Sequence, residues 1–247
     1  MKITKEIAEI AGAFAADGCM QKQHLCMWGN IIEDQEYYNE VLGPLYEQTF
    51  RIKLNIHEKR SNSVYGFNVC DPAVLTFFQE KLGFAPGCKT YTVQAPQPVL
   101  ESDNPHVWAA FLRGYTDCDG SLSFMKRPET YGFPRGYMHM YPRISICSVS
   151  EQMVLDISEL LTRLNIRHTV HGRQPKNPRL HYTWRIIIRG EKRLKQWMKV
   201  IGFSNSAKTT KYEVFCIHGY VPPYTSIVER RQFIKRERCP LEYYLAL

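Results

Sequence analysis

The chain carries the same short pattern twice, and this internal repeat limits its possible folds more than any other feature. The segment LGFAPGCKT, residues 82–90, matches IGFSNSAKT, residues 201–209, at a constant offset of 119. Further upstream, two apolar segments end in Asp-Gly, at Asp17 and Asp119, with an offset of 102. One extra loop near residues 126–142 accounts for the difference of 17. A single insertion therefore reconciles both matches, and we infer a duplicated unit.

Hydrophobic spacing and turn residues predict the same element order, α-β-β-α-β-β-α, in each repeat. The first repeat is expected to have helices at residues 4–17, 34–50 and 71–82, and strands at 18–23, 25–30, 51–59 and 64–69. The second is expected to have helices at 104–119, 150–164 and 191–201, and strands beginning at 121 and covering 141–148, 167–173 and 182–188. This order predicts an α+β fold of two pseudo-symmetric repeats.

The repeats suggest boundaries along the chain. The first repeat covers residues 1–93, a Pro-containing linker covers 94–104, and the second repeat covers 105–212. The remaining residues, 213–247, form a basic tail. Its segment ERRQFIKRER fits two interpretations equally: a set of contacts to phosphates, or a solvated helix.

Composition narrows the class of protein. A net charge of +8 and a pI near 9.0 suggest a polyanionic partner, most simply a nucleic acid, although many basic proteins bind nothing specific. The eight cysteines include no CxxC pair, so we expect buried free thiols rather than a zinc ribbon or a disulfide framework. No signal peptide and no transmembrane segment is recognisable, so a cytoplasmic, intracellular protein with no membrane partner is expected.

An Asp-Gly pair at a helix end has an ordinary explanation, because Gly takes the left-handed cap conformation and Asp favours turns. Two copies in equivalent places favour a functional role over this ordinary explanation. Small residues also recur one turn apart, Gly12 with Ala16 and Gly114 with Cys118, which lets two helix backbones approach closely. Such packing would bring the two terminal carboxylates together.

Paired carboxylates at the negative ends of two helices repel each other and require a cation. Their hard oxygen ligands suit Mg²⁺, which also accepts water and phosphate in its shell. With Lys89 and Lys208 nearby, this chemistry fits phosphodiester hydrolysis, in which the lysines offset charge developing on the phosphate. The alternative for these lysines is simple surface solvation.

The motif segments IAGAFAADG, residues 10–18, and LRGYTDCDG, residues 112–120, resemble the paired motifs of LAGLIDADG homing endonucleases in their monomeric, two-repeat, intron-encoded form. The resemblance implies two four-stranded antiparallel sheets backed by helices, forming a DNA-binding saddle. It also implies catalytic metal sites that use Mg²⁺, with Mn²⁺ as a substitute. The implied metal ligands are the carboxylates of Asp17 and Asp119 and the backbone carbonyls of Ala16 and Cys118. The implied basic catalytic residues are Lys89 and Lys208.

Two positions depart from the family pattern. The earlier acidic position of the motif is Asp117 in the second copy but Ala15 in the first, and Arg113 replaces the usual small residue. Neither change touches the final Asp of a motif, but both question the symmetry of the helix interface. The family's water-orienting polar residue has no clear counterpart; Asn30 and Ser148 are the two candidates.

Polar side chains that alternate with apolar ones on the expected strands would face double-stranded DNA, with Arg or Lys reading guanine and Asn or Gln reading adenine. The predicted DNA-binding residues are Gln21, Gln23, Arg51, Lys53, Asn55, His57, Lys59, Ser123, Arg127, Arg143, Ser145, Arg167, Thr169, His171, Arg173, Thr183 and Arg185. The insertion, with Lys126, Arg135, Tyr137 and His139, could extend the contact. The alternative is that these are solvated strand faces.

The sequence therefore predicts a monomeric, metal-dependent DNA endonuclease that breaks both strands of a long, non-palindromic target. Embedding in an intein is disfavoured, because the chain begins at Met and lacks room for splicing domains. An RNA-splicing maturase and a DNA-binding regulator that has lost cleavage are the alternatives on the same fold. Such regulators typically lack the final acids, and both are present here.

Overall fold

The computed structural model describes residues 3–126, 138–175, 177 and 181–245. The first repeat contains α1 (Lys5–Asp17), β1 (Gly18–Met20), β2 (Leu25–Asn30), the π-helix η1 (Tyr37–Leu42), α2 (Gly43–Phe50), β3 (His57–Lys59), the 3₁₀ turn η2 (Arg60–Asn62), β4 (Val64–Val69), α3 (Pro72–Thr76) and the π-helix η3 (Phe77–Lys81). After α4 (Gln97–Leu100), the second contains α5 (Pro105–Asp119), β5 (Gly120–Lys126), β6 (His139–Ser148), α6 (Glu151–Arg163), β7 (Thr169–Arg173), β8 (Thr183–Arg189) and α7 (Glu191–Val200). The expected element order is present in both.

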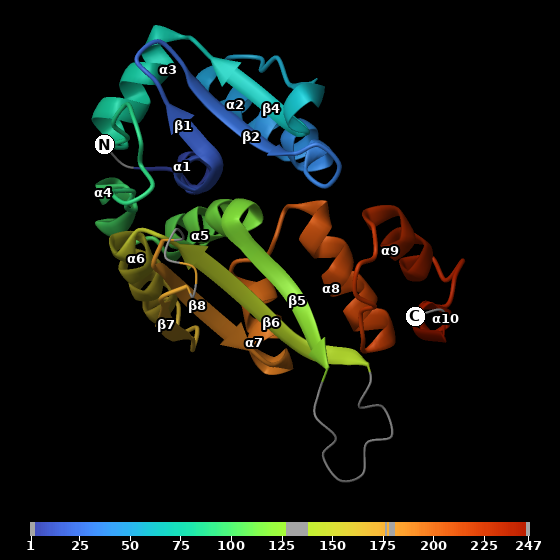
Figure 1. The fold of residues 1–247 in the computed structure, drawn as a ribbon. Coiled ribbons are helices and arrows are strands. Elements are labelled where there is room, and N and C mark those ends of the chain that lie inside the picture. The colour runs from blue at the N-terminus through green and yellow to red at the C-terminus, as the bar shows by residue number, and fades with distance from the viewer. Residues whose placement is uncertain (1–2, 127–137, 176, 178–180, 246–247) are drawn as a thin grey trace.

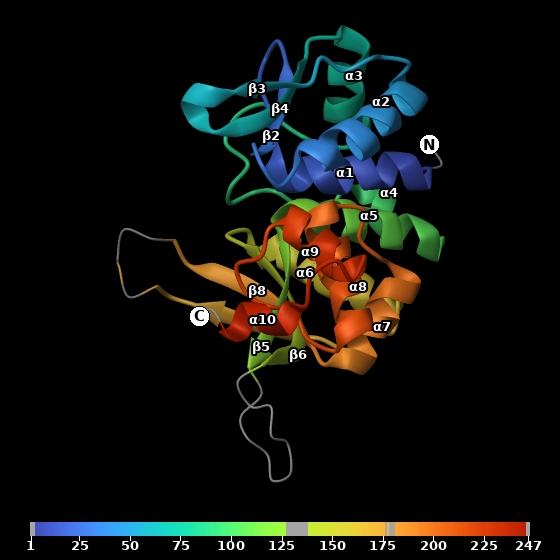
Figure 2. The same cartoon turned by 90° about the vertical axis from the view of Figure 1, so that its right-hand side faces the viewer.

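Each repeat forms one four-stranded antiparallel sheet, and the two sheets have equivalent strand orders: β1-β2-β4-β3 and β5-β6-β8-β7. Helices α1 and α5 lie side by side between the two halves (Figures 1 and 2). Helices α6 and α7 pack on one face of the second sheet, while its other face is turned toward the viewer in Figure 1. The predicted α+β fold, with two antiparallel sheets backed by helices, is confirmed.

Several predicted elements differ in extent. Only residues 57–59 of the expected strand 51–59 are paired in a sheet, although residues 52–56 keep the predicted alternation of half-buried and exposed side chains. The predicted strand at 18–23 ends at Met20, because the chain turns back at Gln21, whose N–H donates to the carbonyl of His24 at 2.8 Å. The predicted linker contains α4.

The described part of the chain also corrects one expectation about cysteine. All eight cysteines are free thiols, as predicted, but none is buried. Cys19, Cys26 and Cys147 lie on the polar faces of the two sheets, which explains their partial exposure. None of the helices within residues 3–245 that the structure describes is long and apolar enough to cross a membrane.

Helices α1 and α5 make the central contact of the molecule, and two glycines set its closeness. A Cβ atom added to Gly12 would lie 2.1 Å from the carbonyl oxygen of Phe111, and one added to Gly114 would lie 2.1 Å from that of Glu9. The reciprocal contacts, which also involve Tyr115 and Ala13, show that the two helices run parallel and in register. The predicted small-residue packing is thus present, and both C-terminal ends lie on the same side.

The glycines that end these helices serve a different purpose from the one expected. Gly18 and Gly120 have extended backbones, with φ of −73° and −91°, so neither uses the left-handed region. They are required by space: a Cβ at Gly18 would lie 2.2 Å from the ring of Phe14, and one at Gly120 would lie 2.2 Å from Thr116. The chain therefore turns from helix to strand directly under the carboxylates.

The C-terminal segment folds back on both repeats. It contains α8 (Ser206–His218), α9 (Ile227–Ile234) and α10 (Pro240–Leu245), and α8 runs across the boundary predicted at residue 212. Arg231 on α9 forms a bidentate ion pair with Glu36 of the first repeat, at 2.7 and 2.6 Å. Arg230 is fully buried and donates to the carbonyl of Ala207 at 2.6 Å. Arg231 therefore joins α9 to the first repeat, and the buried Arg230 fits neither interpretation of this segment.

Candidate active site

Two carboxylates from opposite repeats meet at the centre of the molecule. Asp17 is the last residue of α1, and Asp119 is the last residue of α5. Because the two helices are parallel and in contact, their last turns bring the two side chains together. The negative charge of Asp119 therefore disfavours ionisation of Asp17. Asp17 is half-buried and Asp119 is exposed to solvent, so the pair is reachable from outside.

The electrostatics of this pair favour binding of a cation. Burial, together with the neighbouring charges of Asp119 and Asp34, raises the pKa of Asp17 to about 7. Partial burial of its carboxyl also raises the pKa of Asp119, although the positive charges of Lys89 and Lys208 oppose this shift. A carboxylate whose ionisation is disfavoured by burial and by a neighbouring carboxylate is stabilised when a cation neutralises the pair.

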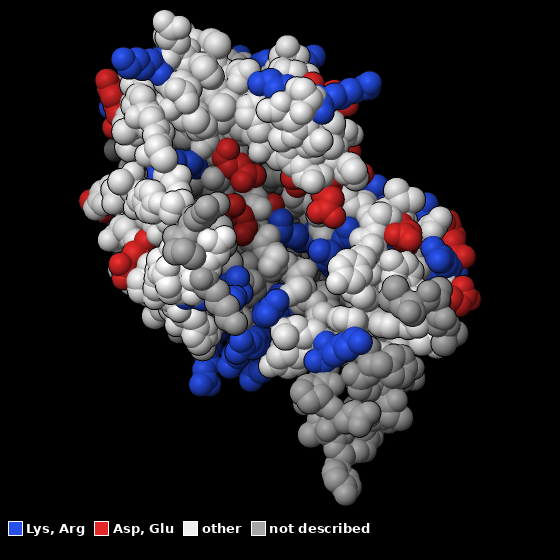
Figure 3. Space-filling model, in the orientation of Figure 1, with Lys and Arg blue, Asp and Glu red and all other residues white. Residues whose placement is uncertain are grey.

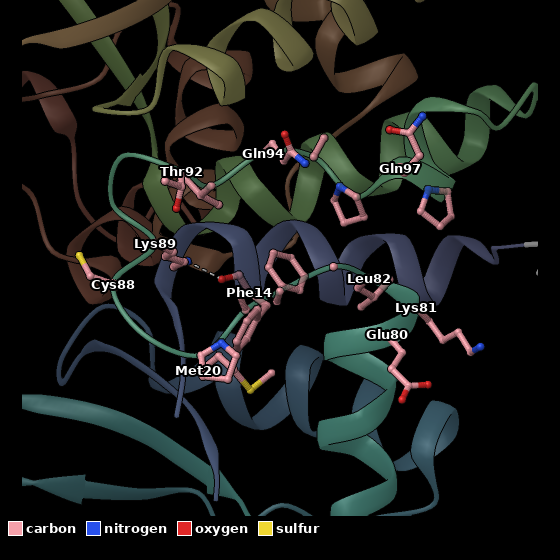
Figure 4. Close-up of a pocket in the computed structure, with 18 residues that line it drawn as sticks. Phe14, Met20, Glu80, Lys81, Leu82, Cys88, Lys89, Thr92, Gln94 and Gln97 are labelled. Carbon is pink, nitrogen blue, oxygen red and sulfur yellow. Dashed lines mark hydrogen bonds between the residues drawn. The ribbon is translucent and has the colours of Figure 1, made fainter. Parts of the chain in front are cut away.

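The two predicted lysines reach the same helix ends. Lys89 donates from Nζ to the carbonyls of Phe14 at 2.7 Å and Ala16 at 2.9 Å, and also to that of Ala15. Figure 4 shows Lys89 reaching across to Phe14 from the segment that follows η3. Burial lowers the pKa of Lys89 to about 8. The carbonyl of Ala16, an implied metal ligand, is thus occupied by an ammonium group in this structure.

Lys208 occupies the equivalent place in the second repeat. It is 7% exposed, and its Nζ donates to the carbonyl of Asp117 at 2.5 Å. The carbonyl of Asp117 corresponds to that of Ala15, which accepts from Lys89, so the repeat equivalence extends to these contacts. Neither lysine is a solvated surface residue, because both place their charge on the negative end of a helix.

The two departures from the family pattern have a shared explanation at the helix interface. Arg113 forms a bidentate ion pair with Glu9 of α1, at 2.8 and 2.5 Å, and donates to the carbonyl of Ile201 at 3.0 Å. Asp117 is 1% exposed and accepts from the backbone N–H of Ser204 at 2.7 Å. Both residues join α5 to elements around it, so the interface is asymmetric without displacing either terminal carboxylate.

Register places the polar residues of the second sheet on one face. Residues directly opposite in neighbouring strands share a face, and the pairs Ser123–Arg143, Cys147–Arg185 and His171–Arg185 link all four strands. The predicted residues on this face are Ser123, Arg143, Ser145, Thr169, His171, Arg173, Thr183 and Arg185. Arg189 lies opposite Arg143 on the same face and was missed by sequence reasoning. Arg167 is exposed just before β7.

The first sheet presents a smaller polar face. His57 and Lys59 lie on β3, and Trp28 of β2 joins them: the Lys59 ammonium lies 3.7 Å from the centroid of the Trp28 ring. Trp28 was missed, because a lone aromatic in a strand is usually part of the core. The other predicted residues are exposed at turns or in the extended segment before β3, namely Gln21, Gln23, Arg51, Lys53 and Asn55. Arg127, Arg135 and Tyr137 lie outside the described residues.

Asp119 lies on the wall of a hollow between the two halves of the molecule. Figure 3 shows acidic side chains gathered inside this hollow and basic side chains grouped over the second repeat below it. One wall of the hollow is lined by Lys89, Tyr115, Asp119, Ser148 and Thr183, among other residues. Ser148, one of the two candidates for orienting water, therefore lines the same wall as Asp119.

The other candidate, Asn30, lies at the end of β2. Its Oδ1 accepts from the backbone N–H groups of Ile32 and Glu33 at 2.8 and 3.0 Å, so this oxygen is used to hold the following turn. That turn presents Asp34, a third acidic residue near Asp17 that sequence reasoning did not select. A lone acid after a strand carries no pattern, which explains the omission.

The donor set fits a magnesium ion. Among residues 3–126, 138–175, 177 and 181–245, no group of three or more His, Cys, Asp or Glu side chains lies close enough to hold a metal. Mg²⁺ does not need such a group, because it commonly keeps several waters and binds through one or two carboxylates and substrate phosphates. Asp17 and Asp119 offer two carboxylates, at an open position where phosphate oxygens could complete the shell.

Comparison with known proteins agrees with this geometry. Residues 107–202 match the family model of LAGLIDADG-like domains. The chain also resembles the homing endonuclease I-DmoI. It superposes on mesophilic variants of I-DmoI with a TM-score of 0.53 at 14% identity, over 80% of this chain and 95% of that one. With I-DmoI in complex with DNA and Mn, the TM-score is 0.52 at 14% identity, over 80% and 96% of the two chains.

A curated relative is the replication factor C small subunit of Methanocaldococcus jannaschii, which is 27% identical over 210 residues. The match covers 84% of this chain, but the chain spans only about a tenth of that protein's length. Residues 107–202 thus resemble a LAGLIDADG-like domain, and the chain has the fold of I-DmoI over about 80% of its length. Homing endonucleases share this fold, and I-DmoI is one of them.

Proposed function

We propose that this protein is a site-specific DNA endonuclease that uses Mg²⁺ to break both strands of a long, non-palindromic target. The observation that carries the proposal is the meeting of Asp17 and Asp119 at the ends of two parallel helices, beside a hollow between the two halves of the molecule. The related I-DmoI structures contain DNA with Mn or Mg. Mn²⁺ is expected to substitute for Mg²⁺ here.

The proposed chemistry divides between the cation and the chain. When bound, Mg²⁺ would supply charge stabilisation and an activated water for phosphodiester hydrolysis. The carboxylates of Asp17 and Asp119 would hold it. Lys89 and Lys208 place positive charge at the same helix ends, where negative charge on the phosphate increases during the reaction.

The polar sheet faces would hold the DNA. Arg143, Arg185 and Arg189 share one face of the second sheet and can contact guanine edges or phosphates. The first sheet offers Lys59 and Trp28 instead. Because the two faces carry different side chains, the proposed target has two unlike halves, and a single chain is enough to contact both.

Cleavage in the presence and absence of metal tests the proposal. The protein is incubated with a DNA library, with Mg²⁺ or with EDTA, and ends created by cleavage are sequenced. We expect double-strand breaks at one sequence with Mg²⁺ and none with EDTA. Specific DNA binding without breaks under any metal would support the non-cleaving regulator, and binding to structured RNA alone would support the maturase.

A pH dependence of metal binding follows from the raised pKa of Asp17. Its carboxyl is protonated below about pH 7 in the metal-free protein, whereas in an unfolded chain its pKa would be near the ordinary value of 3.8. The folded state binds the extra proton between these values, so Asp17 destabilises the metal-free fold increasingly as pH rises through this window. Mg²⁺ binds the ionised form and relieves this cost.

We therefore expect Mg²⁺ to raise the melting temperature more at pH 8 than at pH 6. Thermal unfolding followed by circular dichroism, at both pH values and with and without Mg²⁺, measures the difference. In Asp17→Asn the dependence of the Mg²⁺ effect on pH should be weaker. An equal Mg²⁺ effect at both pH values in the unmodified protein would contradict the assignment of Asp17.

A further inference from the structure

Asp34 is held at the centre of the molecule by both repeats. Its Oδ2 accepts from the backbone N–H of Asn30 at 2.7 Å, and its Oδ1 accepts from the side-chain amide of Asn205 at 2.8 Å. The same amide nitrogen of Asn205 donates to the carbonyl of Asp117 at 3.1 Å. One amide group therefore joins Asp34 of the first repeat to the last turn of α5, the turn that ends in Asp119.

The hold on this carboxylate is rigid. Asn205 is completely buried, and its Oδ1 accepts from the backbone N–H of Ala207 at 2.9 Å, which fixes the orientation of the amide. On the other side, a Cβ added to Gly29 would lie 2.7 Å from Oδ2 of Asp34, so β2 packs directly against the carboxylate. The side chain of Asp34 is thus fixed before any ligand binds.

The hydrogen-bond network of Asp34 and Asn205 is not repeated at the equivalent positions of the other half of the molecule. Under the repeat offset of 119, Asn205 corresponds to Pro86, which has no side-chain amide. Asp117, whose carbonyl shares the amide of Asn205, corresponds to Ala15. The network therefore is not a by-product of the duplication, and it adds a third negative charge to the two that the repeats supply.

Asp34 lies near Asp17 and Asp119, the two carboxylates proposed to bind the cation. Its charge acts directly on Asp17. Both of its carboxylate oxygens already accept hydrogen bonds from the protein, an arrangement that favours contact with the waters of a cation over direct coordination. A carboxylate in such a place accepts hydrogen bonds from the waters of a hydrated cation, and carboxylates of this kind commonly change metal affinity by about 10- to 100-fold.

We propose that Asp34 is a positioning residue of the cation site, held by Asn30 and Asn205 so that it accepts hydrogen bonds from water on a cation at Asp17 and Asp119. The proposal deepens the proposed function and rests on it for the identity of the cation. Because only the first repeat supplies such a residue, its loss should affect the two DNA strands unequally.

Metal binding without DNA provides the first test. The full-length protein is titrated with Mn²⁺ alone, and the free ion is counted by electron paramagnetic resonance. We expect Asp34→Asn to raise the dissociation constant about 10-fold or more. Asn205→Ser, which can still cap α8 but is too short to reach Asp34, should weaken binding in the same direction. The matched control is Glu33→Gln, an exposed neighbour that loses the same charge and should change affinity less than about twofold.

The second test measures the rates at which the two strands of end-labelled target DNA are cut. Asp34→Asn should change the ratio of these rates, whereas a general loss of structure would slow both strands alike. Folding of each variant is checked by circular dichroism, and if Asp34→Asn does not fold, Asn205→Ser decides. Folded variants that bind Mn²⁺ as the unmodified protein does would overturn the proposal, as would an equal loss in Glu33→Gln. Absence of Mn²⁺ binding in the unmodified protein would instead overturn the metal site itself.

Discussion

Replacing Asp17 or Asp119 by Asn should reduce DNA cleavage by about two to three orders of magnitude while leaving DNA affinity nearly unchanged. The substitution keeps the shape of each side chain but removes the charge that would hold the cation. DNA affinity should persist because it depends on the basic and polar sheet faces, which neither substitution touches. Electrophoretic mobility shifts in Ca²⁺ measure affinity, and product formation in Mg²⁺ measures cleavage.

Asp117→Asn is the matched control for this experiment. Asp117 lies on the same helix, two residues before Asp119, and is buried with one carboxylate oxygen accepting from Ser204. An amide oxygen can keep that hydrogen bond, so cleavage should remain within about tenfold of the unmodified protein. Full cleavage by Asp17→Asn or by Asp119→Asn would show that the metal assignment is wrong.

Replacing Gly12 by Ala should destabilise the protein by about 3 kcal/mol and abolish cleavage with it. The added methyl group would lie 2.1 Å from the carbonyl oxygen of Phe111, a backbone atom that cannot rotate away. Helices α1 and α5 would have to separate, which also separates the two carboxylates at their ends. Urea unfolding followed by circular dichroism measures the free energy of unfolding.

Gly43→Ala provides the control for the glycine experiment. Gly43 begins α2 with helical φ and ψ of −54° and −57°. An added Cβ would lie 3.3 Å from the end of the flexible Ile56 side chain and 3.3 Å from the backbone oxygen of Tyr38, both far looser than the 2.1 Å contact at Gly12. Ala favours helices over Gly by about 1 kcal/mol, so the stability of Gly43→Ala should be unchanged or higher. If Gly12→Ala were as stable as Gly43→Ala, the close contact of α1 and α5 would be wrong.

Two parts of the site could be predicted from the sequence, namely the terminal carboxylates and the polar face of the second sheet. Asp17 and Asp119 were found because a duplication marks them twice, and the contact of Gly12 with Phe111 depends on a spacing that the sequence also displays. The strands that carry Arg143 and Arg185 could be placed on one face from their alternation, because side chains of a strand point to opposite faces in turn.

Residues without a periodic signal were missed. Asp34 and Asn205 lie 171 positions apart and meet only because the two repeats pack together. Glu9 and Arg113 form an ion pair across the same contact, and sequence could mark Arg113 as unusual without indicating its partner. Trp28 was missed because a lone aromatic in a strand usually belongs to the core, whereas here it lies on the open face of β2.

Sequence alone determined the duplication, the order of helices and strands, and the pair of terminal acids, because these follow from local spacing that each repeat states independently. Tertiary structure alone decided which features are asymmetric: Arg113 paired with Glu9, Asp117 buried against Ser204, and Asp34 fixed by Asn205. The physical reason is that a hydrogen bond between distant segments depends on how helices and sheets pack, and periodicity within one segment carries no information about that packing.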